Sequence, residues 1–194
     1  MAARTERQDE VLAPAGKTIP DLVGPDLAVL FCGINPGLTS AATGLHFAGP
    51  GNRFWKVLAG AGFTERVWDP TEQSGLPGIG VGITNLVARA TASAAALGAS
   101  ELRAGAGTLE AKVAVWRPRY VAFVGMQAYR QAFARPKATI GRQPDSVGGV
   151  PAWLLPNPSG LQARYQLPEM VEAFTALRHA ALGIPAGRKR SPSR

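Results

Sequence analysis

Residues Leu27–Ile34, with the sequence LAVLFCGI, form a continuous apolar run that leads into Asn35-Pro36-Gly37. A strand that is buried on both faces of a sheet has this composition, and Asn-Pro-Gly is typical of the turn that follows such a strand. Strands of this kind occur mainly in parallel sheets, which need helices on both faces. The run therefore predicts an α/β protein with a central strand that ends near Ile34.

The rest of the chain alternates between strand-like and helix-like segments. Three later segments have the apolar composition of buried strands: 80–87, 120–124 and 153–155. Four segments carry helical start signals or helical periodicity: 52–60, 100–116, 125–133 and 167–181. This alternation predicts a three-layer α/β/α sandwich with a mainly parallel central sheet.

The length and composition indicate one globular domain. The chain has 194 residues, of which 46% are hydrophobic and 18% charged, so it can bury a core of its own. Residues 1–18 and 184–194 are polar, rich in Pro, Gly and Ser, and aperiodic. We therefore expect a flexible N-terminal segment over 1–18, a single domain over 19–183 and a basic flexible tail over 184–194.

The net charge of +8 is unevenly distributed, because the tail contains four basic residues and no acidic one. A basic body with a basic tail suits a polyanionic partner such as nucleic acid, although the same charge also serves solubility. Cys32 is the single cysteine, which excludes an internal disulfide and fits a reducing compartment. With neither a secretory signal nor a membrane-spanning run, we expect a cytoplasmic protein that does not bind membranes.

Two predicted strands end in loops of unusual composition. Residues 33–37 read Gly-Ile-Asn-Pro-Gly, and residues 156–161 read Pro-Asn-Pro-Ser-Gly-Leu. Ligands of open α/β sheets bind beyond the carboxyl ends of the strands, so both loops should face one crevice. Taken alone, however, the segment around Asn35 fits an ordinary turn better than an active site, and a leucine in the place of Leu161 usually packs inward.

The stretch 38–54 between these features is long and rich in Gly and small residues, which predicts a loop that is either functional or disordered. Phe47 lies within it, between glycines, where its ring could stack on a flat ligand rather than pack in the core. His46 could be a base, but a single histidine in a loop is more often exposed to solvent. The sequence leaves His46 without a role.

Four motifs together give the chain a family resemblance. They are GINPG at 33–37, TGLHFAGPGNRFWKVL at 43–58, GITNLV at 82–87 and NPSGL at 157–161. In this order and spacing they resemble the mismatch-specific uracil/thymine-DNA glycosylases of the uracil-DNA glycosylase superfamily. The resemblance extends over about residues 27–182, and it implies the fold of that superfamily.

The resemblance also implies roles for individual residues. Asn35 corresponds to the residue that holds the hydrolytic water, and Asn157 to a polar residue near the glycosidic bond. Phe47 corresponds to the aromatic residue that stacks on the flipped base. Further base-pocket positions implied by the resemblance are Ile34, Gly37, Ser40 and Asn85; some members of the family have lysine at the position of Asn85.

The second loop corresponds to the wedge that enters the duplex. The resemblance implies that Gly160, Leu161 and Gln162 fill the gap left by the base and contact the widowed guanine. Ser159 and Arg164 are expected at the DNA backbone. The family commonly has arginine two residues after the wedge leucine, whereas this chain has Ala163 there, followed by Arg164.

These features predict a monomeric, monofunctional enzyme that removes uracil, or thymine or exocyclic cytosine adducts, opposite guanine in double-stranded DNA. No lysine lies beside the two loops to act as an amine nucleophile, and no Cys/His cluster predicts a metal, so we expect neither strand cleavage nor a cofactor. Two alternatives stay open: a glycosylase of another subclass that acts on single strands, and a non-catalytic nucleic-acid-binding module. A nucleotide-binding protein is less favoured, because no phosphate-binding fingerprint is present.

Overall fold

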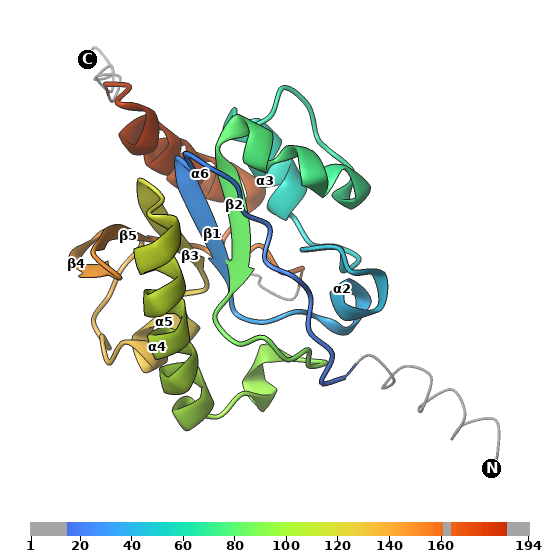
Figure 1. Cartoon of the computed structure of the whole chain (residues 1–194). Helices are drawn as coiled ribbons and strands as arrows, with labels where there is room; N and C mark the ends of the chain where they lie inside the picture. The colour runs from blue at the N-terminus through green and yellow to red at the C-terminus, as the bar shows by residue number, and fades with distance from the viewer. Residues whose placement is uncertain (1–14, 161–163, 186–194) are drawn as a thin grey trace.

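A computed structural model describes residues 15–160 and 164–185, which are built around one five-stranded sheet (Figure 1). The strands are β1 (Val29–Gly33), β2 (Val81–Asn85), β3 (Tyr120–Val124), β4 (Gly141–Val147) and β5 (Val150–Leu155). Their order in the sheet is β2-β1-β3-β5-β4. β1 lies parallel to both β2 and β3, and β3 lies parallel to β5. The mainly parallel sheet predicted from the apolar runs is therefore confirmed.

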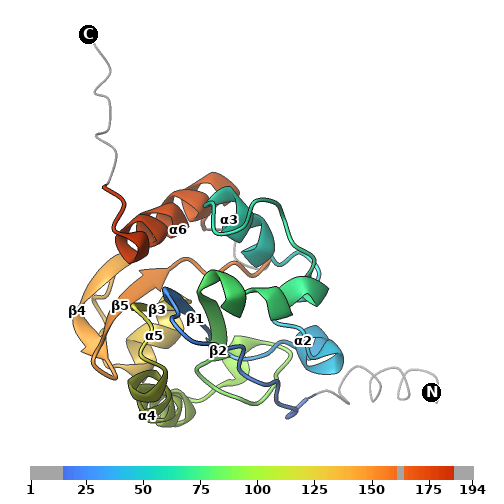
Figure 2. The same ribbon diagram turned by 45° about the horizontal axis from the view of Figure 1, so that its top comes forward.

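Helices cover both faces of the sheet, as Figure 2 shows. On one face lie α4 (Ala99–Trp116) and α5 (Met126–Ala132), and on the other lie α3 (Phe54–Gly60) and α6 (Leu167–Leu182). Alternate residues of each strand enter opposite cores: Leu30 and Cys32 pack with α4, whereas Val29 and Phe31 pack with α3 and α6. β1, β2 and β3 are almost entirely buried because of this arrangement, which is the predicted α/β/α sandwich.

The sequence did not predict β4, which pairs antiparallel with β5 at one edge of the sheet. Most residues of β4 are exposed, Pro144 lies within it, and the register shifts between Arg142 and Ser146. An edge strand tolerates proline and irregular pairing because one of its sides needs no partner. The short strand expected at 153–155 corresponds to β5, which is longer than predicted because it begins at Val150, where it pairs with β4.

The predicted loop over 38–54 contains a helix, α2 (Leu38–Thr43), so this part of the prediction is wrong. Six residues of mainly small side chains are too few for a helical period to be recognised in the sequence. Helix α4 begins one residue before the expected Ser100. The remaining elements are the 3₁₀ turns η1 (Pro70–Gly75), η2 (Pro77–Ile79) and η3 (Ala94–Ala96).

The segment before β1 lies along the other edge of the sheet. Leu22 forms an antiparallel bridge with Ile83 of β2, and Gly16 and Lys17 exchange backbone hydrogen bonds with Ala90. The proposed domain limits at residues 18 and 184 stay predictions, since residues 1–14 and 186–194 lie outside the described part of the chain. Within the described ranges, no helix is long and apolar enough to cross a membrane.

Candidate functional site

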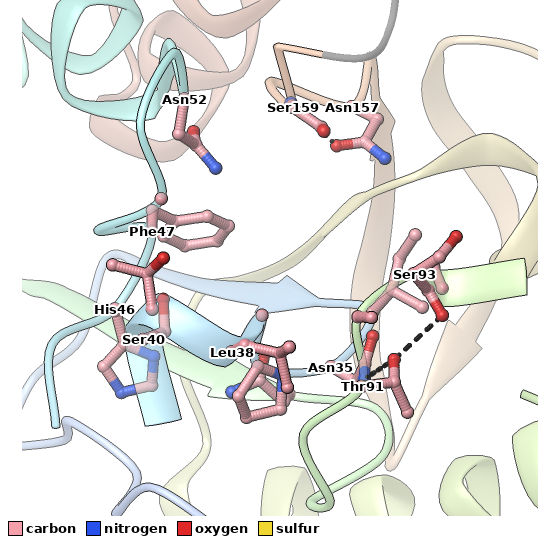
Figure 3. Close-up of a pocket in the computed structure, with 18 of the residues that line it drawn as sticks. Asn35, Leu38, Ser40, His46, Phe47, Asn52, Thr91, Ser93, Asn157 and Ser159 are labelled. Carbon is pink, nitrogen blue, oxygen red and sulfur yellow. Dashed lines mark hydrogen bonds between the residues drawn. The ribbon is translucent and has the colours of Figure 1, made fainter. Parts of the chain in front are cut away.

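A cavity of about 600 Å³ lies at the carboxyl ends of the parallel strands (Figure 3). Each parallel strand contributes to it: Asn35 follows β1, Asn85 ends β2, Val124 ends β3 and Asn157 follows β5. The carboxyl ends of parallel strands meet at one edge of the sheet, where α/β folds bind ligands. The topology therefore brings together side chains that are far apart in the sequence.

Several amide side chains line this cavity. The four asparagines of the chain, at positions 35, 52, 85 and 157, all line it. Among the described residues, the cavity has no Asp or Glu in its lining, although the chain has 13 acidic residues. Such a site supplies hydrogen bonds and no carboxylate base, and its one histidine, His46, is buried with its Nε2 against the Pro20 carbonyl. It therefore suits chemistry that depends on positioning rather than on proton abstraction.

Asn35 is held by two hydrogen bonds from its side-chain nitrogen. Nδ2 donates to the carbonyl oxygen of Arg89 at 3.0 Å and to Oγ1 of Thr91 at 2.7 Å, and Thr91 Oγ1 in turn donates to the Ser93 carbonyl at 2.9 Å (Figure 3). Both protons of the Asn35 amide are thus used by the protein. The side chain therefore meets a ligand or a water molecule through its acceptor, Oδ1.

Whereas Asn35 is held through its side-chain nitrogen, Asn157 is held through its side-chain oxygen. Its Oδ1 accepts a hydrogen bond from the backbone N–H of Ser159 at 3.0 Å, which closes a local turn. The rigid Pro156-Asn157-Pro158 sequence supports this turn, because proline restricts both its own backbone and that of the preceding residue. Asn157 therefore retains its amide N–H groups as donors, whereas Asn35 retains an acceptor.

Phe47 forms one wall of the cavity. Its ring stacks on that of Phe54, with centroids 4.0 Å apart and planes 17° apart, and Phe54 is fully buried. Because Phe54 covers one face of the Phe47 ring, the other face remains for the cavity, toward which the ring points in Figure 3. A flat aromatic ligand could stack there.

The glycine at position 33 allows two of these groups to approach β1. A Cβ atom at Gly33 would lie 2.6 Å from Oδ1 of Asn85 and 3.5 Å from the Phe47 ring. A side chain there would therefore displace the Asn85 amide from the end of the strand. The first glycine of the GINPG motif is thus explained by close packing at the cavity rather than by turn geometry.

The structure brings most of the predicted site residues to this one cavity. Those that line it are Ile34, Asn35, Gly37, Ser40, Phe47, Asn85, Asn157, Ser159 and Gly160. Ser40 is buried, and its Oγ accepts a hydrogen bond from the backbone of Ala48 at 3.3 Å. Arg164 is exposed and does not line the cavity, and Leu161 and Gln162 lie outside the described residues. The roles of all these residues stay predictions.

His46 is buried, with only 3% of its surface exposed, so the expectation of a solvated histidine is wrong. Its Nε2 lies 2.9 Å from the carbonyl oxygen of Pro20, in the segment along β2. Burial lowers the pKa of His46, against a smaller opposing effect of the Pro20 hydrogen bond and of Asp21. The sequence could not predict the burial of His46, because Pro20 is distant from it in the chain.

The lowered pKa of His46 makes stability depend on pH. The unfolded chain binds this proton more tightly than the folded protein does, so we expect the free energy of unfolding to fall as the pH drops below about 6.5. Urea denaturation at pH 7.5 and 5.5 would measure the difference. His46→Gln should reduce it, because the substitution removes the titrating group. An equal pH dependence in wild type and His46→Gln would contradict the assignment.

Arg53 links the two loops of the site. Its Nη1 donates to the carbonyl of Tyr165 at 2.9 Å and its Nη2 to the carbonyl of Ser159 at 3.1 Å, while its backbone N–H donates to the Pro158 carbonyl at 2.9 Å. The loop after Phe47 is thereby fastened to the loop after Asn157. Sequence reasoning found neither Arg53 nor Thr91, because their partners are distant in the chain.

Nucleophilic cysteine chemistry does not fit this site. Cys32 is buried within β1 and is not part of the cavity lining, and burial is the largest of the effects that raise the pKa of its thiol. A thiol in such surroundings stays protonated and unreactive. In the part of the chain that the structure describes, no three His, Cys, Asp or Glu residues gather where they could hold a metal ion.

Comparisons with known proteins agree with this architecture. Residues 20–178 match the family model described as the uracil DNA glycosylase superfamily. Among solved structures, the chain is similar to a solution NMR structure of a candidate uracil DNA glycosylase from Methanosarcina acetivorans. The TM-score is 0.56 at 18% sequence identity, and the match covers 84% of this chain and 99% of the other. At this identity the structural match shows a shared fold.

Proposed function

Since the family model matches most of its length, the chain belongs to the uracil-DNA glycosylase superfamily, and we propose that it hydrolyses the N-glycosidic bond of uracil opposite guanine in double-stranded DNA. Thymine and exocyclic cytosine adducts are further candidate bases. A base within a duplex is inaccessible, so the target nucleotide has to leave the stack and enter the cavity.

The observation that carries this proposal is the fixed orientation of Asn35. Arg89 and Thr91 occupy both amide protons, which leaves Oδ1 to accept a hydrogen bond from an attacking water. A positioned water reacts faster than a free one because its approach is already organised. Since no carboxylate lines the described part of the cavity, Asn35 aligns the water without removing its proton, which predicts a modest rate.

The leaving pyrimidine requires a different kind of stabilisation. Cleavage of the glycosidic bond places negative charge on the base, and hydrogen-bond donors directed at its oxygens stabilise that charge. The amide N–H groups of Asn157 can supply such donors, since its Oδ1 is occupied by Ser159. Stacking on the free face of the Phe47 ring would hold the base within reach of the Asn157 amide.

Specificity for guanine mispairs is proposed to come from two effects. A mispaired base is easier to extrude than a paired one, and the loop that begins at Gly160 would enter the vacated position and contact the unpaired guanine. Arg53 supports this role, because it holds the carbonyls of Ser159 and Tyr165 on both sides of that loop. Exposed Arg164 is proposed to contact the DNA backbone.

One experiment tests the proposal and its alternatives. The protein is incubated with duplexes containing G·U, A·U, G·T or an exocyclic cytosine adduct opposite guanine, and with single-stranded uracil DNA; alkali then reveals abasic sites. We expect faster release from G·U than from A·U, and intact strands before alkali. Faster release from single strands would favour a glycosylase of another subclass. Strand breaks without alkali would indicate a lyase, and binding without base release would indicate a non-catalytic module.

Thr91 tests the positioning of Asn35 within this reaction. Thr91→Val keeps the shape of the side chain but removes the hydroxyl that accepts from Asn35, so we expect the single-turnover rate to fall about tenfold. Thr91→Ser retains the hydroxyl and should retain most of the rate. Equal rates for the two variants would show that the hydroxyl does not orient Asn35.

A further inference from the structure

The backbone at Phe47 is strained. Its φ is +53°, in the left-handed region that side chains other than glycine rarely adopt. Such a conformation persists only where the surrounding structure imposes it, and it is often found at functional sites. Something near Phe47 must therefore hold the turn that aims its ring into the cavity.

Gln73 of η1 holds the backbone that leads into that turn, at two points before Phe47. Its Nε2 donates to the carbonyl oxygen of Gly44 at 3.1 Å, and its Oε1 accepts from the backbone N–H of His46 at 2.8 Å. A primary amide carries a donor and an acceptor in one rigid group, so it can pair with a carbonyl and an N–H two residues apart. His46 is also held through its carbonyl, which accepts a hydrogen bond from Trp55 Nε1 at 3.3 Å.

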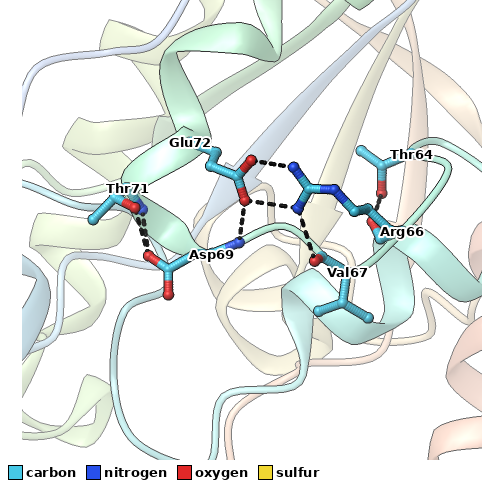
Figure 4. Close-up of polar contacts among 6 residues, drawn as sticks. All are labelled: Thr64, Arg66, Val67, Asp69, Thr71 and Glu72. Carbon is cyan, nitrogen blue, oxygen red and sulfur yellow. Dashed lines mark hydrogen bonds and ion pairs between the residues drawn. The ribbon is translucent and has the colours of Figure 1, made fainter.

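The turn that carries Gln73 is itself fixed, as Figure 4 shows. Glu72 accepts two hydrogen bonds from the guanidinium of Arg66 and one from the backbone N–H of Asp69, while Asp69 caps η1 by accepting from Thr71. The hydrogen bonds from Arg66 lower the pKa of Glu72 to about 2, so the carboxylate stays charged at neutral pH. Gln73 therefore projects from an anchored element.

The geometry points to Gln73 as a positioning residue that orients Phe47 for stacking on the extruded base. This inference rests on the proposed function, because the base is what the Phe47 ring would meet. Gln73 touches neither the base nor the water; it acts through the backbone on either side of Leu45. Its loss should impair the capture of the base and leave the general affinity for DNA intact.

The test compares Gln73→Met, which keeps the length of the side chain without its hydrogen bonds, with Gln73→Glu, which keeps the acceptor for His46. Gln143→Met is the matched control, since Gln143, in β4 and outside the cavity lining, also makes two hydrogen bonds to the backbone, both donated by its Nε2 to carbonyl oxygens. The measurements are the single-turnover rate on G·U duplex, inhibition by free uracil, affinity for undamaged duplex, and NMR amide exchange at His46.

For Gln73→Met we expect a rate about tenfold lower, weaker inhibition by uracil, faster exchange at His46 and unchanged affinity for undamaged duplex. Gln73→Glu should keep His46 protected and retain an intermediate rate, and Gln143→Met should keep the wild-type rate. An unchanged rate in folded Gln73→Met, or an equal loss of affinity for undamaged duplex, would overturn the inference. If the wild type releases no uracil, the proposed function fails, and unchanged exchange at His46 in Gln73→Met would separately overturn the role of Gln73 in holding the turn.

Discussion

Replacing Asn35 with alanine is expected to lower the single-turnover rate of uracil release by about 10²–10³-fold, because the attacking water loses the oxygen that aligns it. The half-buried Asn35 side chain makes its hydrogen bonds to Arg89 and Thr91 and belongs to neither hydrophobic core cluster. Stability and duplex affinity should therefore remain close to those of the wild type. Single-turnover kinetics with saturating enzyme would isolate the chemical step.

The control for Asn35→Ala is Gln131→Ala, which removes an exposed amide side chain from α5, outside the cavity lining. It should leave both the rate and the affinity unchanged. If Asn35→Ala releases uracil and binds DNA as the wild type does, the assigned role is wrong. If uracil release is lost while DNA binding is retained, the result favours an enzyme over a non-catalytic binding module.

Gly105→Ala is expected to lower the free energy of unfolding by about 1–3 kcal/mol, although alanine normally favours a helix interior. A Cβ atom at Gly105 would lie 2.3 Å from the carbonyl oxygen of Leu86, so α4 would have to move away from the backbone that follows β2. The same segment leads to Arg89 and Thr91, which anchor Asn35. The rate of base release should therefore fall together with stability.

The same helix offers a control of opposite sign. Gly107 is exposed, and nothing lies within 4 Å of the position that its Cβ would occupy. Gly107→Ala should raise the free energy of unfolding by about 0.5–1 kcal/mol, through the lower backbone entropy of the unfolded chain. Urea denaturation of both variants would measure the difference. Stabilisation by both substitutions would show that α4 does not pack so closely on Leu86.

The sequence predicts those parts of the fold in which local composition and burial agree. The strand expected at 120–124 has the bounds of β3, because all of its residues are apolar and most are buried. β4 escaped prediction because its stability comes from pairing with β5 rather than from apolar side chains of its own. α2 escaped prediction because a helix of six residues depends on its surroundings more than on its own propensity.

The candidate site shows the same division. Asn35, Phe47 and Asn157 follow from motifs whose residues are neighbours in the chain, and the parallel topology explains why they line one cavity. Their supports, Thr91 and Gln73, could not be predicted, because each acts on a residue tens of positions away. The predicted wedge residues Leu161 and Gln162 lie outside the described residues, and their role stays a prediction.

The position of β1 between β2 and β3 has a consequence during protein synthesis. β1 leaves the ribosome before its partners β2 and β3, which follow after long intervening segments. Its apolar residues must therefore remain without their native neighbours while the nascent chain grows. Parallel pairing between distant segments is slow to form, and exposed apolar strands invite aggregation. An apolar strand that is synthesised well before both of its neighbours thus lengthens the time over which the nascent chain can aggregate.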